Sequence, residues 1–196
     1  MRKMEDRRVR RTREALHGAL IALVLEKGYE AVTVQDIIDR ADVGRSTFYA
    51  HYQGKEDLLT SGMDGLRAML VQHQQAALAG TGQPTERCLG FSRALFEHAE
   101  GYRDIFRALV GERSSAIVLG RMRRLLTELV RADLAALKAG DGAREAIVQF
   151  VVGGLLALMT WWLEHRGTTA AAEIDAQFRA LAVPAMLAGE TRLATR

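Results

Sequence analysis

Apolar residues recur along most of this chain at the spacing of amphipathic helices. Between residues 8 and 27 they fall at the i, i+3, i+4, i+7, i+8 positions that share one face of a helix. The residues of this face are Leu16, Ala19, Leu20, Leu23 and Val24. Gly28 follows and predicts the helix end, because glycine tolerates the left-handed conformation of a C-cap.

Two short helices joined by a tight turn are predicted next. Thr33 is a favourable N-cap for a helix over residues 33–41. A third helix is expected over residues 45–51, with Phe48 and Tyr52 directed inward. Two short helices separated by a turn of about three to four residues form a helix-turn-helix, whose second helix enters the DNA major groove.

The outward surface of this unit carries side chains suited to DNA. Arg45 lies in the first turn of the third helix, where arginine is able to pair with guanine O6 and N7. Lys55 opens a fourth helix, and its charge together with free N–H groups suits a phosphate. A solvated Arg45, and a Thr47 hydroxyl bonded to its own helix, are the alternatives. The predicted DNA contacts are Thr33, Gln35, Arg45, Ser46, Thr47, Tyr49, His51 and Lys55.

The positive charge of the chain is concentrated at its N-terminal end. Residues 1–55 hold 11 Lys and Arg against 8 Asp and Glu, whereas residues 56–196 hold 16 of each. A basic arm ahead of the folded head suits phosphate binding, and a solvated terminus is the alternative. The basic residues of the arm are Arg2, Lys3, Arg7, Arg8, Arg10, Arg11 and Arg13.

The remainder of the chain is also predicted to be helical, which makes the fold all-α. After the fourth helix, five more are expected at residues 85–99, 102–110, 114–138, 142–165 and 170–188, so that the chain has about nine helices. We expect two domains. Residues 1–55 form a three-helix DNA-binding head with its basic arm, and residues 56–196 form a helical ligand-binding and dimerisation domain.

One predicted helix is apolar on nearly all sides. It contains Ile147–Leu163, with the small residues Gly153 and Gly154 in its middle. A second copy of the chain is able to bury such a helix through a two-fold interface, which predicts a homodimer. The alternatives are the central helix of a monomer core and a membrane span, of which we do not expect the span.

The stretch Thr33–Leu59, TVQDIIDRADVGRSTFYAHYQGKEDLL, resembles the DNA-binding signature of the TetR family of bacterial regulators. The shared features are Thr33 at the start of the second helix, the turn of small residues from Ala41 to Gly44, and the segments Thr47–Tyr52 and Lys55–Leu59. The family's turn usually reads Gly-Val-Ser, where this chain has Asp42, Val43 and Gly44. We therefore expect Asp42 to adopt the conformation of the family's glycine, because aspartate tolerates positive φ better than most residues.

The resemblance implies a repressor that binds a palindromic DNA operator as a homodimer. On this resemblance, a small molecule of unidentified chemistry is expected to bind the C-terminal domain, to change the separation of the two heads and so to release the operator. The resemblance also implies that the last two long helices form the dimer interface. The candidate ligand-binding residues are aromatic and methionine side chains, for which a place in the core is the alternative. They are Phe91, Phe96, Tyr102, Phe106, Met122, Phe150, Met159 and Trp162.

The sequence offers few residues that suggest catalysis, redox control or metal binding. The single cysteine, Cys88, indicates a reducing compartment, and we expect a cytoplasmic protein. Control by oxidation at Cys88, or by a protein partner, is the alternative to a small molecule. We find no nucleophile paired with a base, no glycine-rich phosphate loop and no cluster of metal ligands. The sequence therefore predicts no catalytic residue, no cofactor, no metal and no enzyme activity.

Overall fold

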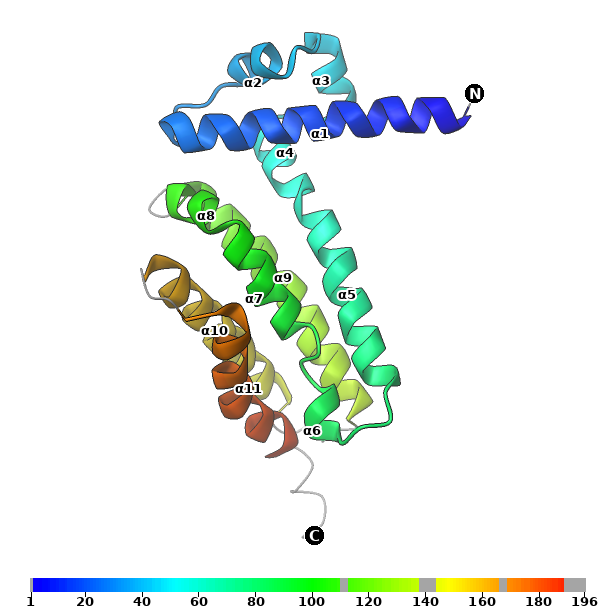
Figure 1. Cartoon of the computed structure of the whole chain (residues 1–196), viewed down its shortest axis with the longest axis vertical. Coiled ribbons are helices and arrows are strands. Elements are labelled where there is room, and N and C mark those ends of the chain that lie inside the picture. Colours follow the sequence, from blue (N-terminus) through cyan, green and yellow to red (C-terminus); the bar gives the residue numbers. More distant parts are fainter. Residues whose placement is uncertain (1, 110–112, 138–143, 166–168, 189–196) are drawn as a thin grey trace. The chain divides into compact units, whose positions relative to one another are not determined.

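The computed structural model describes residues 2–109, 113–137, 144–165 and 169–188, and all regular structure in these ranges is helical. Figure 1 shows the helices in chain order. They are α1 (Arg2–Lys27), α2 (Val34–Ala41), α3 (Arg45–His51), α4 (Lys55–Ser61), α5 (Met63–Ala79), α6 (Pro84–Arg87), α7 (Ser92–Gly101), α8 (Arg103–Leu109), α9 (Arg113–Ala136), α10 (Arg144–Glu164) and α11 (Ala171–Ala188). The all-α fold is confirmed, and the predicted helix ends at 110, 138 and 142 lie outside the described residues.

Two predicted helices are each divided in the structure, which adds two to the expected number. The helix that starts at Lys55 is interrupted at Gly62, where an added Cβ would lie 2.9 Å from the His17 ring. The helix expected over 85–99 is interrupted at Leu89, whose φ of 56° is incompatible with a right-handed helix. The interruption at Leu89 depends on a backbone conformation that apolar periodicity does not report.

The first compact unit consists of Met1–Asp64 together with Asp104–Val118. Its core is formed by the apolar face of α1 packed against α2, α3 and α4, with Ile37, Phe48 and Leu58 fully buried. Tyr52 is buried as well, so the inward orientation predicted for Phe48 and Tyr52 is confirmed. The helix-turn-helix is therefore held on the long first helix.

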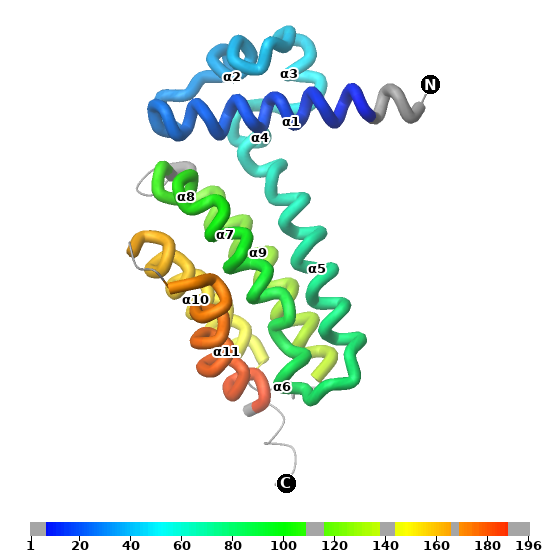
Figure 2. Tube along the Cα trace, in the orientation of Figure 1, coloured from blue at the N-terminus to red at the C-terminus, as the bar shows by residue number. Residues whose placement is uncertain are grey.

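The second compact unit consists of Gly65–Arg103 together with Leu119–Arg196. Within it α7, α10 and α11 lie side by side, as Figure 2 shows. Aromatic residues fill the space between them: the Phe96 ring centroid lies 5.7 Å from that of Trp162 and 6.2 Å from that of Phe178. These compact units are bounded differently from the functional domains expected to divide at residue 55, and that division stays a prediction.

Helix α10 is the most apolar of the described helices. Among the described residues it is the one that is long and apolar enough to cross a membrane, judged by length and composition alone. Half of its apolar segment is buried within this one chain. Its inner face carries Val148, Val152 and Leu155, whereas Phe150 on the other face is 60% exposed.

Candidate DNA-binding interface

The start of α2 is fixed by a reciprocal cap. The Thr33 hydroxyl oxygen accepts the Asp36 N–H at 3.2 Å, and the Asp36 carboxylate accepts the Thr33 N–H at 2.7 Å. The same carboxylate accepts the Thr33 hydroxyl proton at 2.6 Å and lies 2.9 Å from the Lys27 ammonium. The bonds from Thr33 and Lys27 hold the pKa of Asp36 well below its usual range. Thr33, which we predicted to contact DNA, thus uses its hydroxyl proton inside the cap.

The turn between α2 and α3 has the geometry expected from the sequence. Asp42 adopts the left-handed conformation, with φ 51° and ψ 49°, which confirms the prediction for this position. Gly44 is the extended N-cap of α3 and makes no side-chain cap. Its carbonyl oxygen accepts the N–H groups of Thr47 at 2.9 Å and Phe48 at 3.1 Å. The turn therefore directs α3 without help from a capping hydroxyl.

The outer face of α3 is polar and exposed. Because Phe48 is buried, Arg45, Ser46 and Tyr49 face the solvent, and Tyr49 is 48% exposed. The Arg45 guanidinium carbon lies 5.6 Å from the centroid of the Tyr49 ring, and its Nη1 lies 3.5 Å from Gln35 Oε1. Gln35 is in turn bonded to Asp39 at 2.8 Å. Residues of α2 and α3 thus hold Arg45 at the surface, where it is able to meet a base edge.

The other predicted contacts are less accessible. Thr47 and His51 are half-buried on α3. The Lys55 ammonium, for which we predicted a phosphate contact, donates in this structure to the backbone carbonyl oxygens of Tyr29 at 3.0 Å and Val32 at 2.9 Å. Sequence reasoning missed this arrangement because these partners lie 26 and 23 residues earlier in the chain.

The basic arm continues α1 beyond its packed part. The helix begins at Arg2, whereas the first fully buried side chain of its apolar face is Leu16. The arginines described in this part are all exposed, and of them Arg10 lies 3.6 Å from Glu14. These exposed arginines are Arg7, Arg8, Arg10, Arg11 and Arg13. The side chains of residues 2–6 lie outside the described part. The arm therefore presents its positive charge on a helix rather than on an extended strand.

The candidate ligand-binding residues do not form one group. Phe91, Phe96, Met122, Met159 and Trp162 are buried in the second unit. The other three are not buried with them: Phe150 and Tyr102 of the same unit are 60% and 46% exposed, and the half-buried Phe106 belongs to the first unit. Burial of five of the eight residues fits a place in the core as well as a ligand site, so the ligand-binding assignment stays a prediction.

Two buried carboxylates in the second unit have no counterpart in the sequence reasoning. Asp133 of α9 accepts the Leu89 N–H at 2.7 Å and a Gln74 amide proton at 2.8 Å. Asp175 of α11 accepts the Ser92 hydroxyl proton. Burial raises the pKa of Asp133 to about 6 and also raises that of Asp175. Neither residue stands out in the sequence, because the groups that they bind lie on other helices.

Comparison with known proteins identifies both parts of the chain. The family model for bacterial regulatory proteins of the tetR family matches residues 18–61, and a model for a transcriptional regulator C-terminal region matches residues 86–183. An HTH-type transcriptional regulator of Bacillus subtilis, YxbF, is 42% identical over 72 residues, which are 36% of this chain and 19% of that protein. The chain spans less than half the length of each curated relative that it matches here.

Solved structures extend the similarity to nearly the whole chain. A TetR transcriptional regulator from Streptococcus agalactiae is 26% identical, with a TM-score of 0.66 over 93% of this chain and 99% of that one. The fold is also that of Thermus thermophilus FadR, a transcriptional repressor solved with lauroyl-CoA, which is 23% identical with a TM-score of 0.63 over 89% and 95% of the two chains. The helix-turn-helix, the helical C-terminal region and these matches together establish that the chain belongs to the TetR family of bacterial regulatory proteins.

Proposed function

We propose that this protein is a dimeric repressor that binds a palindromic operator and is released from it by a small molecule. The observation that carries the proposal is the exposed polar face of α3, on which Arg45, Ser46 and Tyr49 project while Phe48 is buried beneath them. A helix held in this way fits the major groove and presents an arginine to a guanine edge. The regulator would act in the cytoplasm, where bacterial DNA lies.

The arm adds contacts that do not depend on DNA sequence. Its exposed arginines lie on the same long helix that supports α2 and α3. Neutralising phosphates with arginine releases counterions and strengthens binding to any duplex. The proposed division of labour is that α3 selects the operator and the arm raises affinity for DNA in general.

The dimer is supported by apolar surface on the last two helices. Phe150 and Trp161 of α10 are 60% and 48% exposed, and Leu181 of α11 is 72% exposed. An added Cβ at Gly153 or Gly154 would meet no atom within 4 Å, so a second helix has room to approach there. Exposed apolar patches of this kind mark interaction surfaces, and a two-fold contact lets the same face cover itself.

The effector is proposed to bind among the buried aromatic residues of the second unit. Phe96 and Trp162 meet edge to face in its interior, and ligand pockets are lined predominantly by apolar and aromatic side chains of this kind. The Thermus repressor with lauroyl-CoA shows that this fold accommodates a small-molecule complex in that protein. Cys88 is fully buried, which argues against oxidation of its thiol as the signal.

Selection of bound duplexes from a randomised DNA pool tests the proposal. The expected product is a palindrome whose half-sites are bound by a protein dimer, with dimer formation confirmed by sedimentation at micromolar concentration. Failure to enrich any sequence, or enrichment of a single half-site by a monomer, contradicts it. Release of the selected duplex is then measured with lauroyl-CoA as one probe, and with a panel of hydrophobic metabolites as others.

A further inference from the structure

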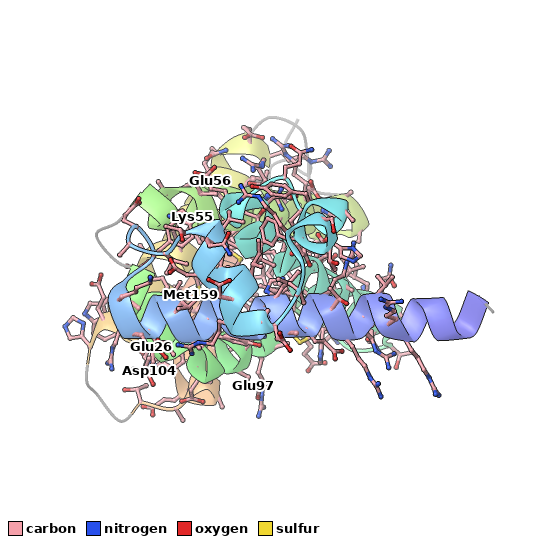
Figure 3. All side chains as sticks on the ribbon, turned by 90° about the horizontal axis from the view of Figure 1, so that it is seen from above. Glu26, Lys55, Glu56, Glu97, Asp104 and Met159 are labelled. Carbon is pink, nitrogen blue, oxygen red and sulfur yellow. The ribbon has the colours of Figure 1, made fainter. Side chains whose placement is uncertain are left out.

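The ammonium group of Lys55 lies at the convergence of three backbone carbonyl groups. It donates to the carbonyl oxygens of Tyr29 at 3.0 Å, Glu30 at 3.4 Å and Val32 at 2.9 Å. It also lies 4.4 Å from the centroid of the Tyr29 ring. Figure 3 shows Lys55 at the start of α4, beside the loop that joins α1 to α2. All of these groups belong to the first compact unit.

The chemistry of this contact is specific to lysine. An ammonium carries three donors in a compact arrangement, and three carbonyl oxygens receive them here. Hydrogen bonds from a charged donor are stronger than neutral ones, and the face of an aromatic ring attracts the same cation. Tyr29 is almost fully buried, so its ring is held in place by packing and the ammonium lies over a fixed aromatic face. The side chain therefore closes the loop onto the first turn of α4.

This loop leads directly into the DNA-binding elements. Val32 is followed by Thr33, the N-cap of α2, and Gln35 lies in the first turn of that helix. From the other side, the Lys27 ammonium at the end of α1 contacts Asp36 in the same turn. The first turn of α2 is thus held by α1 through Lys27, and the loop that precedes this turn is held by α4 through Lys55.

We propose that Lys55 is a positioning residue: it fixes the loop of residues 29–32, and through it Gln35, and it makes no phosphate contact of its own. The proposal rests on the proposed binding of DNA by α2 and α3. It changes the expected role of Lys55 from a direct source of affinity to a group that acts through the geometry of its neighbours.

The first test requires no DNA. Lys55→Met keeps the apolar stem and removes the ammonium. Amide hydrogen exchange should become at least tenfold faster at Val32 and Ile37, whose N–H groups bond to Tyr29 O and Thr33 O. It should stay unchanged at Tyr52, whose N–H bonds to Phe48 O at the end of α3. Unchanged exchange at Val32 and Ile37 overturns the proposal.

A matched control removes a charge elsewhere on the head. Arg40 pairs with Glu26 at 2.6 Å on the exposed surface of α2 and α1, and its charge is matched by that carboxylate rather than by loop carbonyl groups. Arg40→Met should leave exchange at Val32 unaltered. Circular dichroism checks that each variant is folded. Lys55→Gln, which keeps an uncharged donor, replaces Lys55→Met if the latter does not fold, and the same acceleration is expected.

The second test separates positioning from phosphate contact. Lys55→Met should weaken binding to the selected operator about tenfold, equal to about 1.4 kcal/mol, while the slope of affinity against salt stays as in the wild type. A slope reduced by about one identifies a lost phosphate contact and overturns the proposal. Lys55→Arg should fail to restore affinity, because a planar guanidinium does not match three converging carbonyl oxygens. Full restoration by arginine overturns the proposal, since charge alone is then sufficient.

A double-mutant cycle tests whether Lys55 acts through Gln35. Gln35→Ala should cost less operator affinity in the Lys55→Met background than in the wild type, because the side chain is already displaced there. Additive losses overturn the proposal. If the wild-type protein selects no operator at all, the proposed function fails, and the exchange measurements still decide whether Lys55 holds the loop.

Discussion

The carboxylate of Asp133 accepts the backbone N–H of Leu89 at 2.7 Å, although the two residues are 44 positions apart. Leu89 has a positive φ of 56° and forms the corner between α6 and α7. A buried N–H without an acceptor would cost about 1–3 kcal/mol. Asp133 on α9 supplies that acceptor, so a carboxylate of one helix stabilises the turn between two others.

This relationship predicts a dependence of stability on pH. Burial raises the pKa of Asp133 to about 6, above the ordinary 3.8, although the hydrogen bonds from Leu89 and Gln74 and the charge of Arg179 oppose the shift. The folded state therefore keeps a proton that the unfolded chain releases, and the free energy of unfolding falls as pH rises from about 4 to 6, by roughly 3 kcal/mol. In Asp133→Asn the side chain is neutral at every pH, so the free energy of unfolding of this variant does not fall as Asp133 ionises.

Urea unfolding of the wild type and of Asp133→Asn at pH 4 and pH 7.5 measures the effect. From pH 4 to pH 7.5, the free energy of unfolding of Asp133→Asn should rise relative to that of the wild type by roughly 3 kcal/mol. Glu100→Gln, which changes an exposed carboxylate of α7, is the control. An equal difference at both pH values would show that Asp133 does not titrate in this window.

The left-handed conformation of Asp42 predicts that glycine is the more stable residue there. A side chain with a Cβ is strained at its φ of 51°, whereas glycine is not. Asp42→Gly should raise the free energy of unfolding, by less than the roughly 1–2 kcal/mol that the left-handed conformation costs an L-residue, because glycine loses more backbone entropy on folding. Asp42→Val should lower it by about 1–2 kcal/mol, since a β-branched residue tolerates this region poorly. Thermal unfolding compares the three proteins, and a glycine variant below the wild type refutes the argument.

Substitution of Arg45 should change sequence preference rather than general affinity. A bidentate arginine–guanine pair contributes about 1–3 kcal/mol of discrimination, so Arg45→Ala should relax preference at one base pair in each half-site. Arg7→Ala, in the exposed arm, should instead weaken all duplexes alike and lower the salt slope by about one. Titrations against the operator and its single-base variants compare the two. If Arg45→Ala binds the operator variants in the wild-type order of affinity, Arg45 does not read a base, and Gln35 and Tyr49 become the candidates for base recognition.

Charge placed on the exposed face of α11 should prevent dimer formation. Leu181 is 72% exposed in the single chain, and a carboxylate buried there against a second copy would lack a partner. Leu181→Glu should therefore sediment as a monomer and bind the palindrome more weakly. Leu25→Glu is the matched control, because Leu25 is 50% exposed on α1, outside the proposed interface. A dimeric Leu181→Glu protein would place the interface elsewhere.

The parts of the head that sequence reasoning predicted depend on local signals. The apolar face of α1, the cap at Thr33 and the left-handed Asp42 each depend on residues within one or two helical turns. Periodicity also predicted that Phe48 points inward, which in turn exposes Tyr49. Such features follow from helix geometry and capping, which the order of residues specifies directly.

By itself, the sequence determined that the chain is helical, that it carries a helix-turn-helix and that it resembles the TetR family. Only the tertiary structure decided that Lys55 binds the loop before α2, that Asp133 holds the corner at Leu89, and that Phe96 is enclosed while Phe150 is exposed. The physical reason is range. A helix forms from hydrogen bonds between residues four apart, whereas the partner of a long polar side chain is set by helices that pack together from distant parts of the chain.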